Sequence, residues 1–493
     1  MVPSSSVLRL VALATGALVL SVTGPRLEAQ LVPVRTVPVA SGDQFRLVPS
    51  SRMGMGGVRY AVDDSLADGW SNPARPGSAT VFMGSPTFYG ISANGGAGRS
   101  FPVAGLFSGE QWFGGASLAL QQVENEPGNV VCCFVDWFGP PPVTTLSERF
   151  GRNVFAGGFV GRRLGNGWSA GVGASVARLG AMDGVDLLYA GAERIDQAGD
   201  LVNLRAAVEH AGPRDRISAQ IVHDRVSMVH DVTWSEWIWD DTLGTGELVR
   251  RIEKNEDRTN TWAGQLSWDR RLNAPGWRIA AVAAVNHKSH PKIPNYSIQN
   301  IPRDPGTTWA FEAGFGLSRT QGPTTFGVDV ALQPIWSDTW QEADSADVAD
   351  SGGRLSIGDR SIENDFSFTN VVLRTGVAHA VGPAEFQTGL EIRSYGYTLD
   401  QANWVEVSRR SQDEAWIEWS PTFGLSVSLP ALDLRYGMRI TEGTGRPGVA
   451  PDFLLESPVA GGDADFLIAP GAPLTLQDAR VMTHQLAVVI PVR

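Results

Sequence analysis

Three features are scarce in this 493-residue chain. After the first thirty residues no stretch approaches 18 consecutive apolar residues, which argues against a protein that crosses a membrane by helices. Cysteine occurs only as the adjacent pair Cys132 and Cys133, and no second pair of ligands at a suitable spacing points to a metal site. Positive charge is in deficit, with 40 Lys and Arg against 52 Asp and Glu, so nucleic acid is not an expected partner. No cofactor is expected.

The first 29 residues are typical of a secretory signal peptide. Arg9 precedes an uncharged apolar stretch, residues 10–22, that is too short to span a bilayer as a helix. Residues 27–29 place a small residue at the cut position, so the mature chain is expected to begin near Gln30. Loss of the two arginines and one glutamate of this peptide changes the net charge from −12 to −13. The exported chain is then either soluble or a membrane-spanning barrel.

The chain is rich in glycine and aromatic residues, and apolar and polar side chains alternate along it with a period of two residues. It contains 56 Gly, 16 Trp and 20 Phe, and only 19% of its residues are charged. Within residues 308–320 every second side chain is apolar, and the intervening ones are small or polar; the apolar set is Trp309, Phe311, Ala313, Phe315 and Leu317. Because side chains alternate faces along a strand, this pattern predicts strands with one apolar and one polar face.

The lengths and spacing of these segments favour a transmembrane antiparallel β-barrel. Fourteen candidate strands, most of 12 residues or more, are long enough to cross a bilayer with tilt: 112–123, 153–164, 167–179, 200–211, 214–229, 259–272, 276–288, 307–320, 323–336, 363–380, 384–399, 414–429, 431–442 and 480–492. Residues 79–91 and 99–107 offer a further pair, which would make 16 strands. A soluble β-sandwich or propeller is the alternative, although no repeat of 40 to 50 residues supports a propeller.

Short and long connections alternate along the chain. Six tight turns, at 165–166, 212–213, 274–275, 322, 382–383 and 430, alternate with seven long connections, at about 124–152, 180–199, 230–258, 289–306, 337–362, 400–413 and 443–479. Outer-membrane barrels show this asymmetry, with short periplasmic turns and long extracellular loops. An even number of strands then places both chain ends on the periplasmic side.

The polar faces of the predicted strands should line the lumen. They carry interleaved charges of both signs: Arg205, Glu209, Glu312, Glu385, Glu391, Arg393, Asp433, Arg435 and Arg439. Two interpretations stay open. The charges can form a paired structural network, since a poorly hydrated unpaired charge is costly, or they can form a polar wall that guides a solute.

A glycine-rich segment, residues 45–77, precedes the strands. Gly54-Met55-Gly56-Gly57 resembles half of a dinucleotide fingerprint, but no strand precedes it, which argues against a nucleotide site. Asp63 can cap a short helix through residues 64–68, and Asn72 can cap a turn that begins at Pro73. The segment is too short to hold a core of its own, so we expect it to pack inside the barrel.

The order of motifs in this segment resembles the N-terminus of the long-chain fatty-acid transporter (FadL/OmpP-like) superfamily. The matching residues are Phe45, the run 52–57 (RMGMGG), the run 61–64 (AVDD) and Asn72-Pro73-Ala74. The resemblance implies an outer-membrane barrel of 14 strands formed by residues 79–493, with residues 30–78 as a periplasmic segment and hatch that plugs the lumen. The implied hatch residues are Gly54, Gly56, Gly57, Asp63, Asp64, Asn72 and Pro73.

The same resemblance implies a function. Members of the superfamily carry hydrophobic compounds such as fatty acids or aromatic hydrocarbons across the outer membrane of Gram-negative-type bacteria, with outer-membrane lipid around the barrel. The related PorV-like barrels instead serve protein secretion, so a protein that docks on the extracellular loops is the alternative partner. An enzyme is not expected, because the seven histidines have no recognisable nucleophile beside them.

Three further expectations concern particular side chains. Trp234, Trp237 and Trp239 lie in a predicted polar loop, where they can gather a hydrophobic ligand or simply continue the flanking strands. Cys132 and Cys133 can form a vicinal disulfide, an intermolecular link or two free thiols.

The third expectation is that Asp63 and Asp64 of the hatch pair with arginines of the lumen. The candidate partners are Arg205, Arg393, Arg435 and Arg439.

Overall fold

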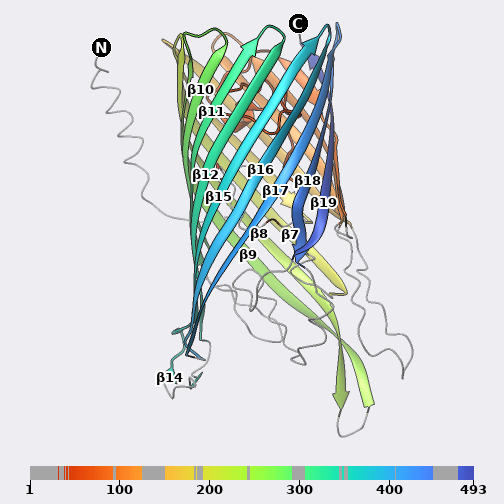
Figure 1. Ribbon diagram of the computed structural model, residues 1–493. Helices are drawn as coiled ribbons and strands as arrows, with labels where there is room; N and C mark the ends of the chain where they lie inside the picture. The colour runs from red at the N-terminus through yellow and green to blue at the C-terminus, as the bar shows by residue number, and fades with distance from the viewer. Residues whose placement is uncertain are drawn as a thin grey trace.

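The fold is seen in a computed structural model of the chain (Figure 1). It describes residues 31–32, 38, 40–42, 44–92, 96–124, 150–182, 185, 192–240, 245–290, 306–343, 347–348, 354–405, 407–447 and 476–492. Within these ranges, no helix has the length and apolar character needed to cross a membrane. Helix α2 (Asp68–Ser71) has four residues.

One antiparallel sheet closes on itself to form a barrel. It contains 17 strands, but β1 (Val81–Gly84) and β2 (Thr87–Ile91) both lie between β19 (Leu476–Pro491) and β3 (Ala97–Ser108). They are successive pieces of one strand, so the barrel has 16 strand positions. The expected count of 14 is wrong, and the difference is the further pair that the sequence offered near residues 79–91 and 99–107.

The other barrel strands pair in chain order with their neighbours. They are β4 (Trp112–Glu124), β5 (Phe150–Gly165), β6 (Trp168–Leu179), β7 (Arg194–Ala211), β8 (Asp215–Asp240), β9 (Thr245–Arg271), β10 (Trp277–His290), β11 (Gly306–Gln321), β12 (Thr324–Glu342), β15 (Arg360–Val381), β16 (Ala384–Asn403), β17 (Ser408–Ser428) and β18 (Asp433–Pro447). The short strands β13 (Asp347–Val348) and β14 (Arg354–Leu355) form a separate pair outside the barrel.

The two ends of the barrel differ, and Figure 1 shows the difference plainly. At the short-turn end, at the top of the view, successive strands are joined by a few residues; the link between β5 and β6 uses Asn166 and Gly167 with positive φ angles of 50° and 80°. Such left-handed conformations suit Asn and Gly in two-residue hairpin turns. At the opposite, long-loop end, strands of unequal length extend beyond the barrel.

The longest extension is the hairpin of β8 and β9. The two strands stay paired from Asp215 opposite Arg270 out to Asp240 opposite Thr245. Residues 230–258 were expected to form a long loop, and this expectation is wrong because β8 continues to Asp240 and β9 begins at Thr245. The hairpin projects from the long-loop end (Figure 1, yellow-green).

The two faces of each strand are chemically distinct. On β11, Trp309 and Phe315 are exposed on the outside, whereas Glu312 between them is buried on the inside. Large exposed apolar side chains recur around the barrel, as at Leu120 (62% exposed) and Val172 (55% exposed). Only lipid can cover an apolar band on the outside of a closed barrel, so the chain is an outer-membrane β-barrel protein.

Residues 44–77 lie inside this barrel (Figure 1, red and orange). We distinguish a leading stretch, residues 31–47 as far as they are described, from a ring, residues 50–77. The leading stretch contacts the inner wall through apolar side chains, such as Val32 against the β12, β15 and β16 side and Phe45 against Phe155. Its Pro38 and Ala40 also form backbone hydrogen bonds with Gly445 of β18. The ring packs Leu66 and Trp70 against wall side chains such as Phe159, and it also makes many polar contacts, which form the first part of the candidate site.

Candidate functional site

The ring follows the inner wall in the direction opposite to strand order. Its residues meet successive strands as follows: Met53 meets β18, Gly54 meets β16 and β17, Met55 meets β15, Arg59 and Tyr60 meet β11 and β12, Asp63 meets β8 and β10, Asn72 meets β7, and Pro73 meets β5 and β6. A segment of about two dozen residues therefore touches most of the circumference.

Glycines on both sides allow the ring backbone to approach the wall closely. A Cβ atom on Gly376 of β15 would overlap the carbonyl group of Met55, and one on Gly389 of β16 would overlap the backbone of Gly56. Gly56 itself has a φ of 64°, a conformation that L side chains rarely adopt. The glycine-rich motif is therefore explained by backbone packing and not by a phosphate site.

Wall side chains satisfy the backbone groups of the ring at this point. Thr422 on β17 accepts a hydrogen bond from the Gly56 N–H at 2.8 Å and donates one to the Gly54 carbonyl at 2.8 Å. Gln387 on β16 accepts from the Gly54 N–H at 3.0 Å and donates to the Ser51 carbonyl at 2.9 Å. Buried backbone groups need partners, and here two wall side chains supply them in pairs.

The next contact is made by Arg59 and Tyr60. Their two N–H groups donate to one carboxylate oxygen of Asp329 on β12, at 2.7 and 3.2 Å. The Tyr60 hydroxyl donates to Glu312 on β11 at 2.7 Å, and the Arg59 guanidinium lies 3.3 Å from the same Glu312 oxygen. Two buried wall carboxylates thus anchor two consecutive ring residues.

Asp63 forms a charge contact with two arginines of the wall. Arg278 on β10 donates two hydrogen bonds to its carboxylate at 2.7 and 3.0 Å, and Arg216 on β8 donates a third at 2.8 Å. Although partial burial opposes ionisation, these two guanidinium groups hold the pKa of Asp63 well below its usual range. Asp63 has lumen arginines as partners, but neither belongs to the four candidates named from sequence.

Asp64 has a different role from the one expected. Its carboxylate accepts hydrogen bonds from the N–H groups of Ser51, Leu66 and Ala67, at 2.9, 3.0 and 3.1 Å. It therefore holds the ring together internally, and no lumen arginine is hydrogen bonded to it in the described part of the chain. The expected cap at Asp63 is also wrong: Asp64 caps the turn, because Asp63 is engaged by the wall.

The last part of the ring is anchored on β7. Glu209 accepts hydrogen bonds from the Asn72 side-chain amide at 3.3 Å and from Arg75 at 3.1 Å. Arg205 donates to the carbonyls of Trp70 and Ser71, at 3.1 and 3.0 Å, which are free at the end of α2. Two of the residues predicted to line the lumen, Arg205 and Glu209, are thus brought to the ring.

Two wall glycines also make room for the carbonyl oxygen of Pro73. A Cβ atom on Gly171 of β6 would overlap it, and one on Gly161 of β5 would come within 2.7 Å. Ser169 donates to the neighbouring Ala74 carbonyl at 2.7 Å, and the Asn72 side chain accepts from the Ala74 N–H at 3.0 Å. The Asn72-Pro73 turn expected from sequence is formed at this place.

Further wall charges connect to one another. Glu391 accepts from Arg374 at 2.7 Å and from Arg439 at 3.1 Å, and Arg393 lies 3.8 Å away. Arg393 also donates to Gln333 at 3.1 Å.

Gln333 in turn donates to Glu312 at 2.6 Å, which links this cluster to Arg59 and Tyr60 of the ring. Arg374 was missing from the charges predicted to line the lumen, although the alternation of its strand places it on the same face as Gly376. At the short-turn end, Arg435 pairs with Asp433 on its own strand at 3.3 Å.

A cavity of about 560 Å³ lies between the ring and the short-turn end of the barrel. Arg52, Asp63, Arg75, Arg216 and Arg435 are among its charged lining residues. The lining also contains apolar side chains such as Leu106 and Phe159, so charged and apolar groups share this cavity.

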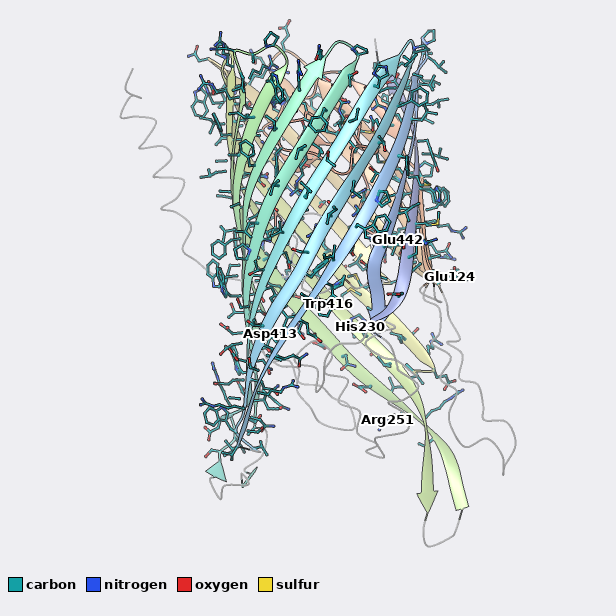
Figure 2. All side chains as sticks on the ribbon, viewed as in Figure 1. Glu124, His230, Arg251, Asp413, Trp416 and Glu442 are labelled. Carbon is teal, nitrogen blue, oxygen red and sulfur yellow. The ribbon has the colours of Figure 1, made fainter. Side chains whose placement is uncertain are left out.

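An aromatic surface lies on the inner wall nearer the long-loop end. We call it the aromatic ladder: Phe366 and Phe368 on β15, Tyr397 on β16 and Trp416 on β17, the last of which is labelled in Figure 2. Ring centroids are 5.6 Å apart for Phe366 and Phe368, 5.7 Å for Phe368 and Tyr397, and 5.9 Å for Tyr397 and Trp416. No residue of the ladder was predicted as a site, because an aromatic pattern inside a strand also fits the lipid face.

The leading stretch covers this ladder. Val32 is fully buried in a cluster with Phe368, Tyr397 and Leu399, and Leu31 packs against the same cluster. The amide of Asn286 on β10 fixes Val32 by donating to its carbonyl at 2.5 Å and accepting from its N–H at 3.4 Å. An apolar site on the wall is thus occupied by the chain's own N-terminal residues.

A polar row borders the ladder on its long-loop side. Arg410 on β17 donates to Gln401 at 2.7 Å, Gln401 donates to Asn364 at 2.7 Å, and Asn364 donates to Thr339 at 3.3 Å. The Tyr397 hydroxyl also donates to Glu414. The wall therefore presents an apolar surface next to polar groups that include one guanidinium.

The other residues predicted as sites from sequence have no described side-chain contacts in this site. Trp234, Trp237 and Trp239 lie on β8 in the projecting hairpin, paired with residues of β9, and their side chains lie outside the described part of the structure. Cys132 and Cys133 also lie outside the described residues. Among the described residues, no group of three or more His, Cys, Asp or Glu side chains could hold a metal ion.

Comparisons with known proteins give fold-level likeness. No family model and no curated protein matches the chain. Among solved structures, it is similar to a FadL homologue of Pseudomonas aeruginosa (TM-score 0.43, 10% identity, 90% of this chain and 99% of that chain covered) and to the toluene transporter TodX of Pseudomonas putida (0.37, 11%, 92% and 98%). It is also similar to the ferric-catecholate import receptor Fiu of E. coli K12 (0.34, 8%, 84% and 82%). At these scores the likenesses carry no argument about function.

Proposed function

We propose that this chain is a passive outer-membrane transporter for hydrophobic small molecules of the fatty-acid or hydrocarbon type. The observation that carries the proposal is the aromatic ladder on the inner wall. Water is a poor solvent for such a surface, and here the side chains of Leu31 and Val32 cover it. A ligand that replaces these two side chains would bury the same apolar area.

The route begins at the long-loop end, which we assign to the outside of the cell because long loops of outer-membrane barrels face outward. The tryptophans of the projecting hairpin, Trp234, Trp237 and Trp239, are the proposed first contact for a hydrophobic solute. The ladder is the proposed second contact, and its polar border suits an amphiphile: Arg410 can pair with a carboxylate while the rings hold the hydrocarbon.

The ring is the proposed hatch. It is anchored to strands around the circumference by carboxylates, by arginines and by close backbone contact with wall glycines. It can therefore keep ions and small polar solutes from crossing the lumen. The leading stretch would move when a ligand takes its place, whereas the ring would remain docked until the ligand passes. The hatch and the ligand site are therefore different parts of one N-terminal segment.

Ligand binding to the purified full-length protein tests the proposal. Palmitate and toluene should each bind, and the double variant Phe368→Ala, Trp416→Ala should weaken binding about tenfold or more, since a buried aromatic ring contributes on the order of 2 kcal/mol. Trp419→Ala is the matched control: Trp419 lies on the same strand as Trp416 but is exposed on the outside.

Two results would count against the proposal. Unchanged affinity in the double variant would remove the ladder from the route. Failure of both ligands to bind, together with a protein that copurifies in stoichiometric amount and is lost when the β8–β9 hairpin is shortened, would favour a PorV-like docking role instead.

A further inference from the structure

The outside of the barrel carries a second feature that transport does not explain. Arg99 on β3, Gln122 on β4 and Arg152 on β5 are directly opposite one another in the strand register, at the long-loop end of the apolar band. Arg99 donates two hydrogen bonds to the Gln122 carbonyl, at 2.8 and 2.5 Å, which fixes its guanidinium along the wall. Their alternation places all three side chains outside, opposite to the buried Ser100, Gln121 and Asn153.

Arg178 on β6 completes the group. It is paired in register with Val154, which is two residues from Arg152 along β5. We call Arg99, Arg152 and Arg178 the arginine triad. All three are exposed, and neither Arg152 nor Arg178 forms an ion pair with any described residue. Two acidic residues lie beside the triad: Asp200 on β7, opposite Arg178, and Glu124 on β4, two residues from Gln122.

An exposed apolar surface lies directly beside the triad, on its membrane side. Phe101, Leu120 and Val154 form the next outward row across β3, β4 and β5, and they are 50%, 62% and 49% exposed. The ring of Phe88 packs edge-on against Phe101 at 6.0 Å between centroids. Cations next to such a row suit an amphiphile whose head is anionic and whose chains lie along the barrel.

The opposite side of the barrel shows that this arrangement is local. At the corresponding long-loop border of β12, β15 and β16, the outward row is Asp338, Asp365 and Asp400, directly opposite one another in register. This row follows the exposed Trp336 on β12. An anionic headgroup would be attracted to the triad and repelled by the aspartate row.

We propose that the arginine triad is a binding site for a phosphate-bearing lipid headgroup of the surrounding leaflet, with the acyl chains against Phe101, Leu120 and Val154. Guanidinium groups match phosphate oxygens in charge and in hydrogen-bond geometry, and arginines spread over β3, β5 and β6 can bind different phosphate oxygens of one headgroup. The site lies outside the lumen and does not depend on what the lumen transports.

Native mass spectrometry of the full-length protein in neutral detergent tests this inference. Diphosphoryl lipid A and phosphatidylcholine are the two probes, titrated separately. The wild-type protein should retain lipid A preferentially, and the triple variant Arg99→Gln, Arg152→Gln, Arg178→Gln should lose about tenfold or more in apparent affinity, because each cation near a bilayer surface adds to the binding of anionic lipid.

The matched control is the triple variant Arg162→Gln, Arg270→Gln, Arg319→Gln, which removes the same charge from exposed arginines at the short-turn end. Its affinity for lipid A should stay within about twofold of the wild type, since screened charges at this distance contribute little. In unheated samples, both variants should keep the electrophoretic mobility of the folded wild-type barrel.

Three results would overturn the proposal: equal losses in the two variants, equal retention of lipid A and phosphatidylcholine by the wild type, or full displacement of lipid A by millimolar inorganic phosphate. The last result would indicate a site for free phosphate without a lipid contribution.

Discussion

The leading stretch and the ring belong to one N-terminal segment, but they are held in the barrel by different forces. The start of the leading stretch, Leu31 and Val32, packs against aromatic and aliphatic side chains, with the Asn286 amide as the polar anchor of Val32. Further along the stretch, Pro38 and Ala40 form backbone hydrogen bonds with Gly445. The ring is held by ion pairs, such as that of Asp63 with Arg278, and by backbone contacts with glycines of the wall. Apolar contacts are non-directional and can be replaced by any apolar ligand, whereas the ring contacts require particular partners.

This difference assigns distinct roles to the two parts. A part that a hydrophobic molecule can imitate is suited to exchange with ligand. A part that depends on charges and close backbone approach is suited to stay in place. A departing ring would remove Tyr60 from the buried Glu312, and it would remove Asn72 and Arg75 from the buried Glu209. The predictions below separate these two roles.

Removal of the ring should have the largest effect. A variant lacking residues 45–77, which include the whole ring and the end of the leading stretch, should fold because the strands close into a barrel without them. This variant should conduct ions through an open lumen in planar bilayers. The wild-type protein should be nearly closed under the same conditions. If the two proteins conduct alike, the ring does not plug the lumen.

A single glycine of the wall should have the next largest effect. In Gly389→Ala the new methyl group would overlap the backbone of Gly56, and overpacking of this kind costs about 1–3 kcal/mol. The ring should undock part of the time, so single-channel recordings should show brief openings absent from the wild type. Gly396→Ala on the same strand is the control, because its new methyl group would make only ordinary contacts of 3.7 Å or more.

The sequence predicted the barrel architecture more accurately than it predicted the contacts between the ring and the wall. Alternation of apolar and polar residues, as at Trp309 to Leu317, is a local property, so strand positions could be read from it. The strand count was less secure, because Ser85-Pro86 interrupts the first strand and leaves two short pieces, β1 and β2. The extent of the β8–β9 hairpin was missed because charged and aromatic residues are mixed along it with no simple period.

The partners of the ring could not be predicted from sequence for a physical reason. Many arginines alternate on the inner faces of the strands, and which of them meets Asp63 depends on the position of the ring around the circumference. Arg278 and Arg216 are the partners because the ring reaches β10 and β8 at that residue. The aromatic ladder was missed for a similar reason, since alternation identifies two faces of a strand without stating which one faces lipid.

Acidification should weaken the docking of the ring in the lumen by a moderate amount. The pKa of Asp63 is lower in the docked ring than in the unfolded chain, so its contribution to docking is complete above its ordinary pKa of about 4 and is lost as the pH falls further through the lowered value. Conductance should therefore stay low from pH 7 to pH 5 and rise below about pH 4.

Asp63→Asn is the control for this titration. It cannot ionise, so it should show the raised conductance already at pH 7 and a smaller further rise in acid. The same acid response in Asp63→Asn and in the wild type would assign the pH dependence to other carboxylates, such as Asp329 or Glu312.

The smallest effect is expected for the leading stretch, and it has the opposite sign. Val32→Ala removes two methyl groups from the surface of the aromatic ladder while keeping the backbone hydrogen bonds to Asn286. If ligand and leading stretch compete for the ladder, the variant should bind palmitate or toluene about two- to tenfold more tightly, because roughly 1 kcal/mol of competing burial is lost. Isothermal titration of the full-length protein measures the change.

Leu47→Ala is the control, since Leu47 packs against a different cluster on the β4 to β8 side. Weaker binding in Val32→Ala would show that Val32 forms part of the pocket around the ligand, and the leading stretch would then be a fixed wall of the site and not its competitor.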